Sequence, residues 1–224
     1  MKKYLIALAL LIPVIAMAGE LNMAVTDDFV NSVKAVEENV EEAGELLDNA
    51  EETFYTLVDL IVELPEISTP KEEVMAVLDS ATKKKDIKAA EELYEKYLAE
   101  TAAREEAFLE LWNNSETKQG IVTYFNNRKE IALSIKEDAQ KALEIDIQAF
   151  KDLADLPEKF KAASEDIANQ VKADPTAAFS AKKVLSAIKE ANESLKATKE
   201  KATQQKETAG KLLNWLKDLV KTEE

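Results

Sequence analysis

The sequence feature that most constrains the fold is a periodic pattern of apolar residues between Phe29 and Leu64. Successive apolar residues are separated alternately by four and three positions, an average period of about 3.5 residues. The pattern is formed by Phe29, Val33, Val36, Val40, Ala43, Leu47, Ala50, Phe54, Leu57, Ile61 and Leu64. This period predicts a long helix whose apolar edge packs lengthwise against other helices.

A second pattern of the same period lies near the carboxyl end of the chain. It is formed by Ala177, Ala181, Val184, Ile188, Ala191, Leu195, Thr198, Ala202, Gln205, Ala209, Leu212, Leu216 and Leu219. Asp174 and Pro175 precede it, and an acidic cap followed by proline at the first helical position is a typical helix start. The second long helix is therefore expected to match the first in length and period.

Two further helices are expected between these two, over residues 70–112 and 115–156. The few glycines and the abundance of Ala, Glu, Lys and Leu are typical of long helices. The sequence thus predicts an all-α, elongated, antiparallel up-down-up-down four-helix bundle with coiled-coil-like packing and breaks near Lys83 and Pro157. Two long helical hairpins that open into a rod or dimerise are the alternative arrangement.

The first eighteen residues have the composition of a secretory signal peptide. Lys2 and Lys3 precede the apolar run Tyr4–Ile15, and Ala16-Met17-Ala18 is an A-x-A cleavage pattern. An uncleaved anchor is the competing interpretation, but the run is shorter than the ~20 residues that span a bilayer. We predict a signal peptide over 1–18 and a single helical-bundle domain over 19–224.

The absence of cysteine excludes the acyl anchor of a lipoprotein as well as any disulfide or thiol chemistry. No later segment is long and apolar enough to cross a bilayer. With a cleaved signal peptide of the Sec type, the mature chain is expected in the periplasm or outside the cell.

The net charge of −15 argues against a nucleic-acid partner, because phosphate binding requires clustered Lys and Arg. Attraction to anionic lipid is disfavoured for the same reason. The segment 24–64 contains twelve acidic residues and one lysine, whereas 176–224 contains ten lysines and seven acidic residues. Opposite flanking charges select partners in coiled coils, so these two helices are expected to be neighbours.

The composition also excludes most catalytic sites. The chain has no histidine, which removes His-dependent nucleophile systems and the usual zinc, haem and di-iron sites of helical proteins. Its glycines are isolated, so no glycine-rich phosphate loop is present. Three Ser-x-x-Lys matches lack the companion motifs of serine–lysine enzymes. The sequence therefore predicts a protein that is not an enzyme and has no cofactor.

A weak candidate cation face lies on the acidic first helix. Glu38 and Glu42 are four residues apart, and carboxylate oxygens are ligands that calcium and magnesium prefer. The competing interpretation, which we favour, is a solvated acidic stripe beside a basic partner helix.

Aromatic residues mark a candidate interaction end. In an up-down-up-down bundle the following residues come to one end: Phe29, Phe108, Trp112, Tyr124, Phe125 and Trp215. Trp and Tyr are frequent binding anchors, although closure of the core explains the same residues and is the favoured interpretation. Residues 54–64, near the other end, are apolar well beyond one helical edge, which indicates burial on several sides or a hydrophobic partner surface.

The function that these features favour is a non-enzymatic secreted or periplasmic interaction protein. It would serve as an envelope spacer, adhesin, assembly partner or client-holding chaperone, through a protein partner or self-association. A ligand-binding bundle, with a divalent cation on its acidic face or an apolar molecule in its core, is one alternative. A membrane-active or lipid-binding bundle that opens onto a bilayer is the other.

Overall fold

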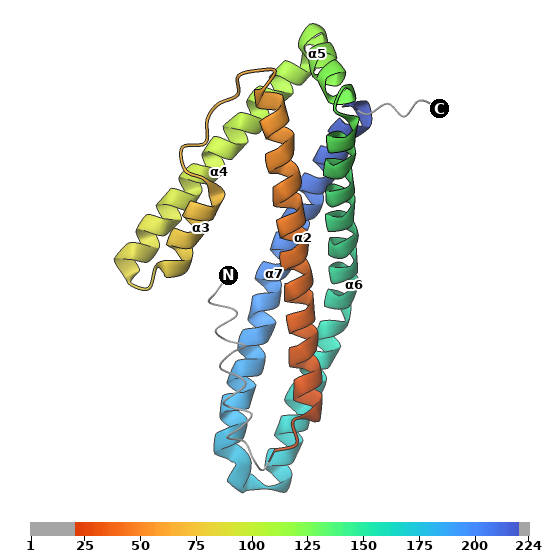
Figure 1. Ribbon diagram of the computed structural model, residues 1–224. Coiled ribbons are helices and arrows are strands. Elements are labelled where there is room, and N and C mark those ends of the chain that lie inside the picture. Colours follow the sequence, from red (N-terminus) through yellow and green to blue (C-terminus); the bar gives the residue numbers. More distant parts are fainter. Residues whose placement is uncertain (1–20, 220–224) are drawn as a thin grey trace. The chain divides into compact units, whose positions relative to one another are not determined.

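The computed structural model describes residues 21–219, and these residues are all-α, without a β-strand (Figure 1). The predicted signal peptide, residues 1–18, lies outside the described residues. The helices are α2 Ala24–Asp59, α3 Lys71–Ser80, α4 Lys84–Asn113, α5 Ser115–Asn126, α6 Lys129–Ala173 and α7 Ala178–Leu219, with a 3₁₀ turn, η1 Pro175–Ala177, before α7. The predicted helical class is confirmed.

The described residues divide into two compact units. Unit 1 contains residues 21–51 and 136–214, and unit 2 contains residues 52–135 and 215–219. The helices α2, α6 and α7 each contribute residues to both units. A single domain was predicted over 19–224, and the described part of it, residues 21–219, contains two compact units.

Unit 1 is a three-helix arrangement of α2, α6 and α7 around an apolar core. The residues that the periodic patterns placed at helix contacts are buried along both α2 and α7. The buried residues of α6 include Ala139, Ala142, Ala149, Leu156, Ala163 and Ile167. Many of these side chains are alanines, and such small residues allow neighbouring helices to approach closely.

In unit 1, α6 runs antiparallel to α2. Near the start of α2, Asp28 pairs with Lys159, with 3.0 Å between the charged atoms. Further along α2, Glu42 pairs with Lys141, which comes earlier in α6, also at 3.0 Å. Acidic side chains of α2 therefore pair with lysines of α6. The sequence had suggested lysines of α7 as their partners.

The predicted contact between α2 and α7 is confirmed, but the two helices run in the same direction. The Ser194 hydroxyl donates to Glu37 at 2.7 Å, and the Gln205 side-chain amide donates to the Val40 carbonyl at 3.2 Å. An up-down-up-down order would make the first and last long helices antiparallel. That order is wrong for α2 and α7. In unit 1 the antiparallel helix α6 is the one long helix between them, so α7 runs in the same direction as α2.

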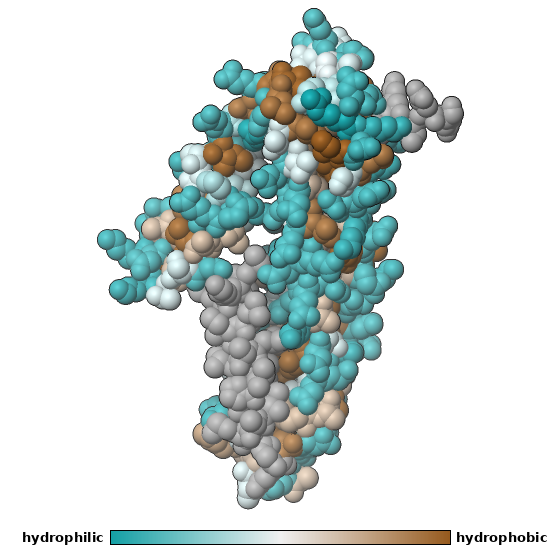
Figure 2. Space-filling model, viewed as in Figure 1, coloured by the Kyte–Doolittle hydropathy of each residue, from teal (hydrophilic) through white to brown (hydrophobic). Residues whose placement is uncertain are grey.

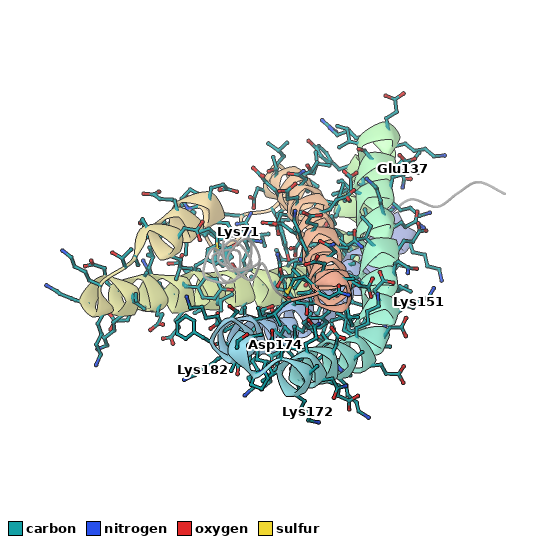
Figure 3. The ribbon with its side chains drawn as sticks, turned by 90° about the horizontal axis from the view of Figure 1, so that it is seen from below. Lys71, Glu137, Lys151, Lys172, Asp174 and Lys182 are labelled. Atoms are coloured by element: carbon teal, nitrogen blue, oxygen red, sulfur yellow. The ribbon has the colours of Figure 1, made fainter. Side chains whose placement is uncertain are left out.

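The predicted break at Pro157 is not present, because α6 continues through this residue to Ala173. Proline inside a helix removes one backbone hydrogen bond and costs about 3 kcal/mol. Pro157 lies on the exposed side of α6, and its neighbour Leu156 is 1 % exposed. Burial beyond the proline, including the Phe160 ring 5.9 Å from the Phe29 ring, offsets that cost. The helix curves along its length in unit 1 (Figures 1 and 3).

The predicted break near Lys83 is confirmed. The helix α3 ends at Ser80 and α4 begins at Lys84. Lys83 occupies the N-cap position without a side-chain hydrogen bond to the helix. A lysine cannot accept hydrogen bonds from the first amide groups, so this helix start has no side-chain cap from that residue.

In unit 2 the segment between α2 and α3 is extended and lies against α4. Arg104 of α4 donates to the Pro65 carbonyl at 2.7 Å and forms an ion pair with Asp59. Further along, the Ser68 backbone amide donates to Glu100 of α4 at 2.8 Å. Because the connection runs back along α4, the end of α4 returns to the end of α2.

A cluster of aromatic rings fills the place where these ends meet. Phe54 is fully buried, and its ring centre lies 5.3 Å from Phe108, 5.6 Å from Phe125 and 5.5 Å from Trp215. The predicted topology placed Phe54 at the opposite end from Phe108 and Trp215. That prediction is wrong, and the extended connection before α3 is the physical reason.

Phe54→Ala is expected to lower the free energy of unfolding of unit 2 by about 3–5 kcal/mol, because it opens a cavity among packed rings. The measurement is urea denaturation followed by tryptophan fluorescence, since both tryptophans of the chain lie in unit 2.

Leu60→Ala is the matched control, because Leu60 is 68 % exposed and its truncation should change stability by less than about 0.5 kcal/mol. Equal effects of the two substitutions would contradict the assignment of Phe54 to the core of unit 2.

Candidate functional site

The candidate site is an open groove on unit 2, between the segment that follows α2 and one face of α5. Its volume is about 710 Å³. The groove is lined by Leu60, Ile61, Glu116, Gln119, Gly120, Thr123, Tyr124 and Asn127. Figure 2 shows hydrophobic residues gathered at the end of α2 next to α5. Polar side chains of α5 complete the lining.

The apolar part of the groove comes from both of its sides. Leu60 is 68 % exposed and Ile61 is partly buried. From α5, the Tyr124 ring lies beneath the Arg128 guanidinium, 3.6 Å from the ring centre. This cation–π contact holds the ring in one orientation and places a positive charge near the end of the groove.

Gly120 leaves the wall of the groove open. A Cβ atom added at Gly120 would meet no atom within 4 Å. By contrast, a Cβ atom at Gly44 in unit 1 would lie 2.5 Å from the Gln205 side-chain nitrogen. Packing within unit 1 explains a glycine at position 44, whereas no contact in the described residues explains the one at position 120.

The structure brings together only part of the predicted aromatic end. In unit 2 the rings of one cluster include Phe108, Trp112, Phe125 and Trp215. Tyr124 lies in the groove, while Phe29 packs on Phe160 in unit 1. Phe108 and Phe125 are fully buried, so the cluster serves the core of unit 2. Phe29 does not join the others, because it lies near the start of α2 and packs in the core of unit 1.

The sequence analysis did not identify Leu60 or Gly120 as site residues. The available signal for Leu60 was the breadth of the apolar segment 54–64, which exceeded what one helix edge needs. The available signal for Gly120 was its position inside the predicted helix 115–156, where glycine is unfavourable. Neither signal alone indicates a groove, since its two sides are separated by more than fifty residues of chain.

The two carboxylates of the predicted cation face have separate lysine partners. Glu38 pairs with Lys34 at 3.4 Å, and Glu42 pairs with Lys141 at 3.0 Å. Among residues 21–219, no group of three or more acidic side chains is placed to hold a metal ion. A divalent cation at Glu38 and Glu42 would have to displace both lysines, and this site stays a prediction.

Unit 1 contains a buried polar cluster where α6 faces α7. Both carboxylate oxygens of Asp146 are buried and accept no hydrogen bond within the described residues. Lys201 supplies a nearby positive charge, and its amino group lies 3.4 Å from the position that a Cβ atom of Gly44 would occupy. Gln205 shares this space. The lack of a side chain at Gly44 therefore makes room for both long side chains of α7.

Burial raises the pKa of Asp146 from 3.8 to about 6, while the Lys201 charge partly opposes the rise. Burial also raises the pKa of Glu37, against the opposing effect of its hydrogen bond from Ser194. Both carboxyl groups face the α2–α6–α7 core, where the charged form is poorly solvated.

One acidic residue, Asp174, lies at the helix connection of unit 1. Asp174 accepts hydrogen bonds from the Thr176 hydroxyl at 2.6 Å and from the Thr176 amide at 3.0 Å, and these bonds lower the pKa of Asp174. Figure 3 shows Asp174 at the connection between α6 and α7, with Lys172 and Lys182 pointing away from the helices.

Comparison with known proteins found no matching family model, no matching curated protein and no matching solved structure. Over the described residues, none of the helices has the length and hydropathy needed to span a membrane.

Asp146→Asn is expected to reduce the pH dependence of unit 1 stability. The folded-state pKa of Asp146 is raised, so the contribution of this group to stability is fully present below about pH 4 and is lost as pH rises through about 6. A shift of this size corresponds to about 1–3 kcal/mol. The measurement is thermal unfolding by circular dichroism at pH 4 and pH 7 for both proteins.

Glu144→Gln is the matched control, because it removes one charge from an exposed position on the same helix. The control should keep the wild-type pH dependence. If Asp146→Asn also keeps the wild-type pH dependence, Asp146 is not a source of that pH dependence.

Proposed function

We propose that this protein is a non-enzymatic interaction protein that binds a protein partner through the groove on unit 2. The observation that carries the proposal is the groove itself, with Leu60 exposed over 68 % of its surface. Leu60, Ile61 and Tyr124 together line this groove, and an apolar patch surrounded by polar residues is typical of an interaction site.

The form of the groove supports a protein partner. Its centre is apolar, with Leu60 and Ile61 on one side and the Tyr124 ring on the other. Its edges carry hydrogen-bonding groups, including Gln119 and Asn127. An apolar centre surrounded by polar groups is the usual arrangement of a protein interface, and tyrosine is among the residues enriched in such interfaces.

Unit 1 serves in this proposal as the structural support. Three long helices with buried apolar edges form the coiled-coil-like part of the predicted bundle, and we assign no partner to their surface. The exposed acidic side chains of α2, such as Glu38 and Glu41, keep this part of the chain hydrated.

The signal-peptide pattern supports a place of action in the periplasm or outside the cell. There, a chain without cysteine has no thiol that could be oxidised. Spacer, adhesin, assembly partner and holding chaperone remain the roles that fit a helical protein with one binding groove.

The proposal predicts selective crosslinking at the groove in cells that produce the full chain. Leu60 is replaced by a photoreactive benzoylphenylalanine, and covalent adducts are identified by mass spectrometry after irradiation. We expect one reproducible protein adduct, because a bound partner would lie within reach of this side chain.

The same replacement at Leu98 is the matched control, because Leu98 is another exposed leucine of unit 2 that does not line the groove. No adduct from Leu60, or the same set of adducts from both positions, would overturn the proposal.

A further inference from the structure

A local reversal of charge lies at the end of unit 1 where α6 connects to α7, over residues 171–189, which we name the tip. We propose that the tip binds the surface of an anionic lipid bilayer, with the Phe179 ring among the lipids and the neighbouring lysines on the phosphate groups. This inference goes beyond the proposed function, in which unit 1 has no partner.

The first step is the exposure of Phe179. Its side chain is 73 % exposed, the largest exposed fraction among the large apolar residues within 21–219. At this end of α7 the buried residues are Ala181, Val184 and Ile188, and helical spacing places them on the side away from Phe179. The core of unit 1 therefore makes no use of this ring.

The second step is the charge around the ring. The tip contains four lysines, at positions 172, 182, 183 and 189, and one acidic residue, Asp174. Lys182 and Lys183 follow Phe179 by three and four positions, so they share its helical face. The Lys183 amino group lies 4.7 Å from the centre of the Phe179 ring. This acidic chain thus exposes a positively charged surface with an aromatic ring at its centre.

The lysines of the tip are available to bind anions. Within residues 21–219, Lys172, Lys182 and Lys189 form no ion pair. Figure 3 shows Lys172 and Lys182 pointing away from the helices. The Asp174 carboxylate accepts its two hydrogen bonds from Thr176 and does not pair with these lysines.

The net charge of −15 disfavours anionic lipid for the chain as a whole, but little of it acts at the tip. Helix α2 begins at this end of unit 1, because it runs antiparallel to α6. Near this end Asp28 pairs with Lys159, and Asp166 accepts a hydrogen bond from Gln170. From Glu37 onward, the acidic residues of α2 lie about 20 Å or more from its start, roughly two Debye lengths at physiological ionic strength.

A lipid surface fits the tip better than a folded protein does. A stable protein interface buries more than about 1,000 Å² around a packed apolar centre. At the tip a single large ring is exposed, and its neighbours are lysines and small side chains such as Ala178. Lipid needs no preformed pocket, since acyl chains accommodate one ring while lysine side chains extend to the phosphates.

A second copy of this chain fits less well, although its α2 is acidic. The exposed face of α2 could receive the lysines, but its side chains there, such as Glu38, Glu41 and Glu45, are charged. Packing the Phe179 ring on them would remove water from carboxylates without any compensating hydrogen bond. Anionic lipid offers phosphate at its surface and apolar chains beneath it, so it accommodates both parts of the tip.

The first experiment is co-sedimentation of the purified chain with vesicles of phosphatidylglycerol and phosphatidylcholine in equal amounts, at ~2 mM lipid. We expect binding at low salt. Binding should be much weaker with phosphatidylcholine alone or at ~0.5 M salt, because the attraction depends on charge and is screened. All variants below keep residues 1–18 as in the wild type, so any lipid contact of that segment is common to all of them.

The second experiment repeats the measurement with variants of the tip. Phe179→Ser should lower the partition coefficient about tenfold or more, because the inserted ring is lost. Lys182→Gln combined with Lys183→Gln should lower it by a similar factor, since each lysine near an anionic surface contributes about fivefold. Helix content and melting temperature should match the wild type, because these side chains are exposed.

Two matched controls lie in unit 1 outside the tip. Ile147→Ser removes another exposed apolar side chain, and Lys196→Gln combined with Lys199→Gln removes two other exposed charges of α7. Both controls should bind the anionic vesicles as the wild type does.

Absence of wild-type binding to the anionic vesicles, or equal losses in the tip and control variants, would overturn this inference. Binding that requires the lysines but is unchanged by Phe179→Ser would exclude insertion of the ring and overturn it as well. The crosslinking test at Leu60 concerns unit 2, so the proposed function and this inference stand or fall separately.

Discussion

The structure depends on covering the long apolar edge of α2. From Phe29 to Ala50 this edge is buried in unit 1, where small and branched side chains of α6 and α7 pack on it. Beyond Glu51 the same edge is buried in unit 2, where Phe54 lies among aromatic rings. Burial of each large apolar side chain contributes about 1.5–3 kcal/mol, so this single helix supplies much of the driving force in both units.

Polar groups in these cores set which arrangement the helices adopt. Apolar contacts alone permit helices to slide, because many registers bury similar areas. Asp146 restricts the register of α6 against α7, because its buried carboxyl group accepts no hydrogen bond and has the Lys201 charge nearby to offset part of its desolvation. Arg104 has a comparable effect in unit 2, where its contacts with Asp59 and Pro65 hold the extended connection on α4. These contacts cost some stability and favour one register.

The periodic patterns predicted the long helices well because local spacing decides which side of a helix is buried. The buried residues of α2 and α7 follow those patterns closely. The direction of the helices could not be predicted in the same way. It depends on the connection after α2, which ends at Asp59, before Pro65. What followed was an extended segment fixed by Arg104 and Ser68, and such long-range polar contacts have no periodic signature.

The candidate site was predictable only in part. Tyr124 was named as part of a candidate interaction end, for which closure of the core was the favoured interpretation, and it lines the groove. Its neighbour Leu60 was expected in a broad apolar segment but on the opposite end of the bundle. The groove exists because the end of α2 and the face of α5 come together, which local sequence does not encode. Prediction from local sequence also failed at Pro157. Local rules predicted a break there, but α6 is continuous because the residues on both sides of the proline are buried in the core.

The order of the two units along the chain affects how the protein folds. Residues 52–135 of unit 2 are inserted between the segments of unit 1, so α2 is synthesised well before the α6 and α7 segments that cover it. Until those segments arrive, the apolar edge of α2 remains accessible to other unfolded chains. The many acidic side chains on the rest of α2 repel neighbouring chains during this interval. The strong negative charge of α2 thus protects a nascent chain from aggregation before its core can close.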